Sequence, residues 1–196
     1  VDKVDFLTFH RDNPFVPLEP MVRKAGELVE RGWVDHFGGS NWSIARIEKW
    51  NSIAEAEGLP KMVLNNPNLS LATVNEAMWS GAYTAGLEDI AWHERTQFPL
   101  FSWSSLGGGW FARVETAEID RVYKNPENIA RRDRMESMAA EKGMRPLQVA
   151  LAYVLSFPFP VWALVGPRSV EQMTELAEAS TVRLTPEEMR WLERGD

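Results

Sequence analysis

The chain has 196 residues, of which 44% are hydrophobic, a formal net charge of −7 and no cysteine. Its length is enough for one sizeable core or two small ones, and its negative charge argues against a nucleic-acid binder, which needs a basic face. The lack of cysteine excludes disulfides and thiolate metal sites. No apolar run approaches the ~18 residues of a membrane span, and no signal-peptide pattern opens the chain, so we expect a cytoplasmic protein.

Five short, largely apolar runs predict strands. These runs cover residues 4–9, 33–39, 62–65, 99–103 and 161–165. Apolar residues at helical spacing predict helices over 18–29, 44–54, 87–97, 127–142, 146–154, 169–179 and from 185 onward. Segment 104–125 is expected to be irregular. Strands that alternate with helices are typical of βα units on a parallel sheet.

Three local features carry further expectations. Ser40 and Asn41, directly after the second predicted strand, are suited to cap the helix that follows. The continuous apolar run 161–165 is typical of a fully buried parallel strand. The arginines of helix 127–142 are interleaved with acidic residues and predict a solvated helix face. They are Arg131, Arg132 and Arg134.

The turn after the fifth strand is the strongest candidate for anion binding. Gly166 and Pro167 end the strand, and Ser169 with Gln172 three residues later makes a capping-box pattern. This geometry directs free backbone N–H groups and a positive helix end at one point, where Arg168 adds a planar fork suited to a phosphate. An ordinary strand-to-helix connection with a surface arginine is the alternative that the local sequence leaves open.

Polar residues follow all five predicted strands. In parallel α/β folds ligands bind at the carboxyl ends of strands, so polar groups on one rim indicate a binding site. Serine and asparagine also occur at such positions simply because they cap helices. The residues are His10, Ser40-Asn41, Asn65-Asn66, Trp103-Ser104 and Arg168-Ser169.

Five segments resemble motifs of the aldo-keto reductase family, in the family's order and near its spacing. They are Asp5-Phe-Leu-Thr-Phe-His-Arg, Gly38-Gly-Ser-Asn-Trp, Asn65-Asn-Pro-Asn-Leu-Ser-Leu, Ser102-Trp-Ser-Ser-Leu-Gly-Gly-Gly and Gly166-Pro-Arg-Ser-Val-Glu-Gln. The resemblance covers nearly the whole chain and implies a (β/α)8 TIM barrel that reduces aldehyde and ketone carbonyls with NADP(H). Such barrels take about 250 residues. We therefore expect residues 1–196 to form one partial barrel domain, the last five βα units.

The resemblance also implies roles for single residues. His10 matches the histidine that polarises the substrate carbonyl, and Ser40 and Asn41 match the pair that binds the nicotinamide carboxamide. Asn66 stands where the family usually has glutamine for the same task, and Trp103 replaces the tyrosine that stacks on the nicotinamide. The other implied contacts are Ser104, Leu106 and Gly108 over the pyrophosphate, Arg168 and Ser169 at the 2′-phosphate, and Gln172 and Glu175 near the adenosine.

The family's proton-donating tyrosine, its lysine and its aspartate lie on strands that this sequence lacks. Tyr83, Tyr123 and Tyr153 match none of these positions, and the three histidines lack metal-ligand spacing. The sequence begins without methionine next to a strand. We therefore expect a missing amino-terminal part, a partner or an oligomer to cover the open sheet edge. A non-catalytic nucleotide-binding or scaffold module, and an unrelated α/β enzyme such as a lyase or isomerase, are the alternatives.

Overall fold

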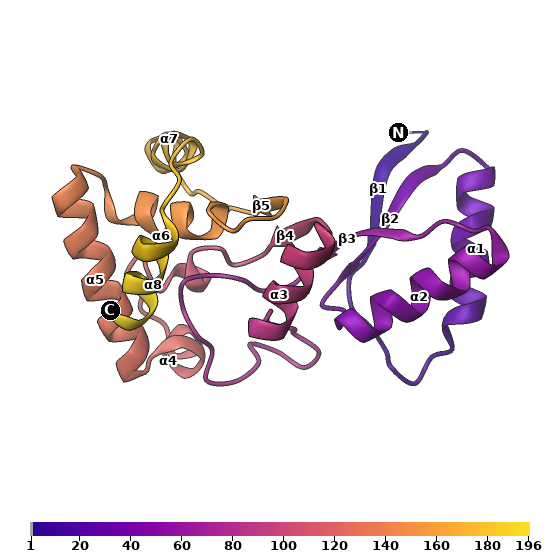
Figure 1. The fold of residues 1–196 in the computed structure, drawn as a ribbon, viewed down its shortest axis with the longest axis horizontal. Helices are drawn as coiled ribbons and strands as arrows, with labels where there is room; N and C mark the ends of the chain where they lie inside the picture. Colours follow the sequence, from indigo (N-terminus) through magenta and orange to yellow (C-terminus); the bar gives the residue numbers. More distant parts are fainter. Residues whose placement is uncertain (1) are drawn as a thin grey trace. The chain divides into compact units, whose positions relative to one another are not determined.

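The computed structural model describes residues 2–196, which form an α/β fold (Figure 1). The strands hydrogen-bond in the order β1-β2-β3-β4-β5 in a parallel sheet. The elements are β1 (Val4–Phe9), α1 (Leu18–Glu30), β2 (Val34–Ser40), α2 (Ile44–Glu57), β3 (Met62–Asn66), α3 (Leu87–Thr96), β4 (Leu100–Ser102), the 3₁₀ turn η1 (Gly107–Gly109), α4 (Ala117–Tyr123), α5 (Pro126–Lys142), α6 (Pro146–Leu155), β5 (Val161–Ala163), α7 (Val170–Ala179) and α8 (Pro186–Arg194). Among the described residues no helix is both long and apolar enough to cross a membrane.

The chain divides into two compact units. Unit 1 contains residues 2–67 and 81–100, and unit 2 contains residues 68–80 and 101–196. The chain therefore passes between the units three times. Our prediction of one family domain over residues 1–196 stays a prediction.

In unit 1, α1 and α2 pack against each other and against the neighbouring strands (Figure 1). Trp42 and Trp50 are fully buried there, with their rings edge-on at 6.0 Å. The predicted helix cap was wrong: α2 begins after Ser43, whose side chain accepts a hydrogen bond from the Arg46 N–H. A cap must lie directly before the first helical residue, and Ser40 still belongs to β2.

In unit 2, α5, α6 and α8 enclose the core, and α6 is buried along most of its length. Segment 104–125 is less irregular than predicted, because it contains α4. Thr116 caps this helix by accepting a hydrogen bond from the Ile119 N–H. Seven residues make only two turns, so few apolar positions repeat and a sequence period is hard to recognise.

The strand β5 is not fully buried, which corrects our prediction. Trp162 and Leu164, in and just after this strand, are 50% and 45% exposed. In unit 1, β1 is exposed in the same way at Val4, Phe6 and Leu7. Both strands end the hydrogen-bonding order, so each has a neighbour on one side alone, and apolar side chains that a next strand would cover stay in contact with solvent.

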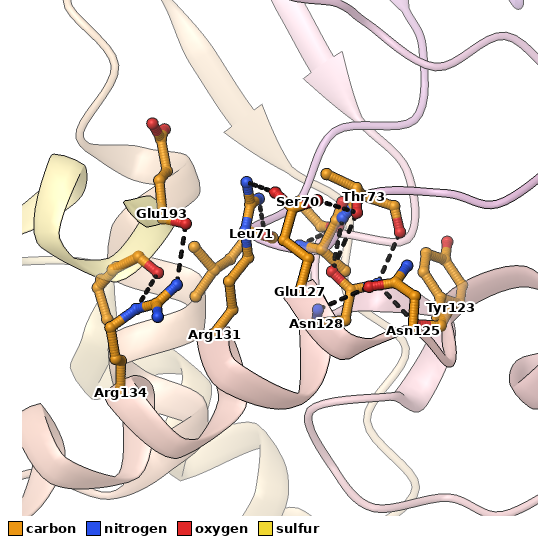
Figure 2. A network of polar contacts seen from close by, with 12 residues as sticks. Ser70, Leu71, Thr73, Tyr123, Asn125, Glu127, Asn128, Arg131, Arg134 and Glu193 are labelled. Atoms are coloured by element: carbon orange, nitrogen blue, oxygen red, sulfur yellow. Dashed lines mark hydrogen bonds and ion pairs between the residues drawn. The ribbon is translucent and has the colours of Figure 1, made fainter. Parts of the chain in front are cut away.

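The arginines of α5 do not form the solvated face that we predicted, because each is half-buried and has a partner. Figure 2 shows the partners of Arg131 and Arg134. Backbone carbonyls at turns and helix ends need hydrogen-bond donors, and guanidinium groups supply them here. Arg134 in this way ties the end of α8 to α5. The partners are the Leu71 carbonyl for Arg131 (2.6 Å), the Trp110 ring for Arg132 (4.4 Å to the ring centre), and the Leu192 and Glu193 carbonyls for Arg134 (2.9 Å each).

Segment 68–80 is fixed to the helices of unit 2 by the buried side chain of Asn128 (Figure 2). The Asn128 amide donates to the backbone carbonyls of Thr73 (2.7 Å) and Tyr123 (2.6 Å), and its oxygen accepts from the Thr73 N–H (2.9 Å). Arg121 on α4 adds a hydrogen bond to the Met78 carbonyl at 2.9 Å. This segment is therefore part of the rigid frame of unit 2.

Candidate functional site

The predicted site residues of unit 1 bond directly to one another. Ser40 Oγ, at the end of β2, donates to Asn66 Oδ1 at 3.0 Å and contacts the Asn66 carbonyl at 3.2 Å. The side-chain amide of Asn41 donates to Ser40 Oγ at 3.2 Å. Parallel pairing of β2 with β3 sets Ser40 opposite Asn66, so the ends of two strands bring these three side chains into one polar cluster.

Asn41 organises this cluster. Its backbone is left-handed, with φ 61°, and its side chain is 6% exposed. The amide nitrogen also donates to the His10 carbonyl at 3.2 Å, and the amide oxygen accepts from the Tyr83 N–H at 3.0 Å. Asparagine tolerates this backbone conformation better than most residues. Asn41 thus holds the chain at His10 and at Tyr83 in place.

His10 follows β1 directly, and its side chain is exposed. Because β1 is an exposed edge strand, burial of the strand does not direct the His10 side chain into a pocket. His10 stands at the carboxyl end of β1, and its carbonyl accepts the hydrogen bond from Asn41.

The three tyrosines each have a hydrogen-bonding partner. The Tyr83 hydroxyl donates to Asp89 Oδ1 at 2.8 Å, and the Tyr153 hydroxyl donates to Glu193 Oε1 at 2.5 Å. Burial raises the pKa of both hydroxyls, and the nearby carboxylates raise it further. Burial also raises the pKa of Tyr123. A high pKa keeps the proton on each hydroxyl, so none is tuned for proton transfer near neutral pH.

In unit 2 a pocket of about 530 Å³ gathers predicted cofactor residues from two segments. One segment is the loop after β4, and the other runs from the end of β5 into α7. Met78 from segment 68–80 and Glu118 from α4 also line the pocket. The predicted residues that line it are Ser104, Leu106, Gly108, Arg168 and Gln172.

The loop Ser104–Gly109 forms one wall of this pocket through an unusual backbone. Ser104 has φ 52°, and Gly107, Gly108 and Gly109 have φ 63°, 61° and 107°. A Cβ atom on Gly108 would lie 3.1 Å from the Tyr123 ring and 3.2 Å from Met78. Glycine is therefore required at 108 by conformation and by space, and the backbone can approach a ligand closely.

The start of α7 forms the opposite wall. Ser169 is the N-cap and accepts from the Gln172 N–H, as predicted, while the Gln172 side chain accepts from the Arg168 N–H at 2.8 Å. Hydrogen bonds from the Glu171 N–H and from Ser169 lower the pKa of the Glu171 carboxyl. The helix end thus binds its own carboxylate, which an external anion must displace. Among the described residues the Arg168 guanidinium pairs with no carboxylate.

Trp103, the predicted nicotinamide platform, stacks on Trp79 with ring centres 4.8 Å apart and planes at 27°. Both rings are half-buried. Stacking on Trp79 occupies one face of the Trp103 ring, so a further ring could stack only on the opposite face. The buried Trp103 Nε1 has no hydrogen-bond partner among the described residues.

The structure does not bring Glu175 into the pocket. Its carboxylate lies 3.9 Å from Arg145, and its carbonyl accepts from Gln148 on α6. Leu176, where the family resemblance implies an adenine contact is lost, is buried in the core. In the part of the chain that the structure describes, no three His, Asp or Glu side chains gather as a metal site.

Sequence reasoning missed the residues that support the site. Tyr83 and Asn68 contact predicted site residues, and Tyr123 packs behind the pocket loop. Asn68 lies in the asparagine-rich stretch that carried the family resemblance, which was a usable signal. Tyr123 had none, because it lies in the helix that showed no period.

Comparisons with known proteins show what the chain is similar to. The model of the Aldo/keto reductase family matches residues 1–194. Versiconal hemiacetal acetate reductase of Aspergillus parasiticus is 26% identical over 200 residues, which cover 97% of this chain and 56% of that protein. Norsolorinic acid reductase A of the same species is 27% identical over 199 residues, which cover 100% and 49%. The chain spans about half the length of these curated relatives.

A solved structure shows the same fold. The aldo/keto reductase from Klebsiella pneumoniae, crystallised with NADP and acetate, is 21% identical with a TM-score of 0.72, and the match covers 98% of this chain and 59% of that one. The parallel five-stranded sheet is thus similar to part of an aldo-keto reductase barrel. On the match of the family model to nearly every residue, the chain belongs to the aldo/keto reductase family.

Proposed function

We propose that this chain is the cofactor-binding portion of an NADPH-dependent aldo-keto reductase, a partial (β/α)8 barrel, that reduces aldehyde or ketone carbonyls. One observation carries the proposal: the 530 Å³ pocket of unit 2 gathers five of the predicted cofactor residues from segments sixty residues apart in the sequence. Two matched relatives are named reductases, and one matched structure contains NADP.

The residues present fit this cofactor. Among the residues that the structure describes, Arg168 has no carboxylate partner, so its guanidinium can bind the 2′-phosphate bidentately, together with Ser169. The glycines at 107–109 allow the backbone to reach a pyrophosphate, whereas a Cβ atom at 108 would crowd the Tyr123 ring and Met78. Ser40, Asn41 and Asn66 would bind the carboxamide, and Trp103 would face the ring. When bound, the nicotinamide supplies the hydride.

His10 acts on the substrate. A neutral imidazole N–H donates a hydrogen bond to the carbonyl oxygen, which polarises the carbonyl and stabilises the developing negative charge. Asn41 supports this role by holding the His10 backbone. The chain's tyrosines are engaged elsewhere, so the general acid comes from further polypeptide. The same polypeptide would cover the edge strand β5 and its adjoining apolar groove of about 360 Å³.

Titration with NADPH and NADH tests the cofactor assignment. The unmutated chain should prefer NADPH, and Arg168→Ala should remove most of the preference, because a charge-assisted hydrogen bond contributes about ten- to a hundredfold in affinity. Arg190→Ala, which removes an exposed arginine on α8, is the matched control and should leave both affinities unchanged. Equal affinities for the two cofactors in the unmutated chain would contradict the assignment.

An activity assay separates the reductase from a non-catalytic nucleotide-binding module. The 196-residue chain alone should not oxidise NADPH in the presence of an aldehyde, because general acid catalysis contributes ~10²–10⁴-fold. When an amino-terminal βα segment of the family that carries the tyrosine is supplied, turnover should appear. Binding of NADPH without turnover in that mixture would favour the non-catalytic nucleotide-binding module. Turnover by the chain alone would refute the expectation that the chain lacks the general acid.

A further inference from the structure

Tyr123, on α4, is a buried side chain behind the loop Ser104–Gly109. Its ring is fully buried and does not line the pocket. A Cβ atom on Gly108 would lie 3.1 Å from Tyr123 Cε2, so the ring backs directly onto the loop. Burial raises the pKa of the Tyr123 hydroxyl, which therefore stays protonated and uncharged at neutral pH.

The Tyr123 hydroxyl also connects to the other end of this loop. Its oxygen accepts a hydrogen bond from Asn68 Nδ2 at 3.3 Å and is hydrogen-bonded to the Ser104 side chain. The same Asn68 amide donates to the Trp103 carbonyl at 3.3 Å, and the backbones of Asn68 and Trp103 form a parallel bridge. The Tyr123 hydroxyl and the Asn68 amide thus hold residues 103 and 104 in place.

Ser104 needs such support because of its backbone. Its φ of 52° lies in the left-handed region, which residues with a Cβ atom disfavour. The Gly107 N–H donates to the Ser104 carbonyl at 2.8 Å, and the hydrogen bond of the Ser104 side chain adds to this support. Ser104 and Gly108 both line the pocket, so a change at either residue alters the surface that meets a ligand.

We infer that Tyr123 is a positioning residue, which sets the conformation of the Ser104–Gly109 loop and thereby the affinity of the pocket for a phosphate-bearing ligand. The ring supports the loop at Gly108, and the hydroxyl, together with Asn68, supports it at Ser104. The identity of the ligand rests on the proposed function, whereas the control of the loop conformation does not.

The variant Tyr123→Phe tests this inference, because it keeps the ring against Gly108 and removes the hydroxyl alone. Amide hydrogen exchange at residues 104–109 should become about two- to tenfold faster, as expected for one lost hydrogen bond. The dissociation constant for NADPH should rise by a similar factor. Tyr153→Phe is the matched control, since it removes another buried hydroxyl, which bonds to Glu193. It should change neither measurement.

Amide hydrogen exchange and NADPH affinity test different parts of the inference. Unchanged exchange at 104–109 in Tyr123→Phe would overturn the inference, whatever the chain binds. Faster exchange with unchanged NADPH affinity would overturn the link from the loop to the ligand. Equal effects of Tyr123→Phe and Tyr153→Phe would show a general loss of stability and would also overturn it. If the unmutated chain binds no NADPH, the proposed function fails, and the exchange data still decide the role of Tyr123.

Discussion

The two units differ in the surroundings of the predicted site residues that each contains. In unit 1, the side chains of the predicted residues Ser40, Asn41 and Asn66 hydrogen-bond largely to one another and to the backbone of His10. In unit 2, the predicted residues line an open pocket with a glycine backbone and a guanidinium that has no carboxylate partner among the described residues.

This difference predicts that substitutions in the unit 1 cluster change stability, whereas substitutions in the unit 2 pocket change ligand binding. A cluster whose members bond to one another is a structural element, so a deletion there leaves buried polar groups without partners. Removal of one exposed group from the lining of a pocket lowers the free energy of unfolding only slightly, because water replaces the group. Variants in unit 1 should therefore lower the free energy of unfolding, whereas variants of the pocket should chiefly change ligand affinity.

The largest effect is expected at Asn41. Asn41→Ala should lower the free energy of unfolding by about 2–4 kcal/mol, since it removes three hydrogen bonds, one buried and two partly buried, and puts alanine at a left-handed position. Asn41→Gly loses the same bonds without the backbone cost and should be about 1 kcal/mol less destabilising. Urea denaturation measures both. If Asn41→Ala lowers the free energy of unfolding by less than about 1 kcal/mol, the cluster of unit 1 does not have the structural role that distinguishes it from the pocket of unit 2.

A smaller effect is expected at Gly108, where unit 2 is sterically tight. Gly108→Ala should cost about 1–2 kcal/mol, because φ is 61° and the new methyl group meets Tyr123 and Met78. NADPH affinity should fall as well, since the loop has to move. Gly143→Ala is the control: its φ is 65° but nothing lies within 4 Å of its Cβ position. This control should lose stability and keep its NADPH affinity.

Acid should destabilise unit 1 selectively. All three histidines lie in unit 1, and burial lowers the pKa of His93, whose Nδ1 bonds to the Phe98 carbonyl at 2.7 Å. The folded state therefore binds a proton less readily than the unfolded state. Stability is complete above the ordinary value of 6.5 and declines as pH falls below it. Melting curves between pH 7.5 and 5.5 measure the decline, and His93→Gln, which keeps a donor for Phe98, should reduce it.

The smallest effect is expected at the start of α7. Glu171→Gln removes the carboxylate that occupies this helix end, so NADPH affinity should increase about two- to fivefold. Glu187 holds the corresponding position in α8 and bonds its own N–H and Thr185. Glu187→Gln is thus a control that should not alter NADPH binding. An equal increase of NADPH affinity in both variants would show that the change in net charge, and not the removal of a carboxylate at the start of α7, causes the effect.

Much of this fold could be predicted from local patterns. The bounds of β1, the start of α6 at Pro146 and the N-cap at Ser169 all match the expectations, because each depends on neighbouring residues. Exposure could not be predicted, because it depends on which strands lie beside a given strand. The exposed edges at β1 and β5 are the result.

The site shows the same limit. The family motifs indicated which residues surround the pocket, and five of them line it. They did not indicate that Glu175 pairs with Arg145 or that Glu171 occupies the helix end. Those contacts depend on side chains from other helices and on competition for the same N–H groups, which no motif records.

The bond between Asn128 and Thr73 has a consequence for synthesis on the ribosome. The two residues are 55 positions apart, and translation at ~5–20 residues per second needs roughly 3–11 seconds to cover that distance. During this interval segment 68–80, with its apolar Leu69 and Leu71, has emerged without the helix that buries it. The nascent chain is therefore most open to chaperones and proteases at this segment, while most of unit 1 is already complete.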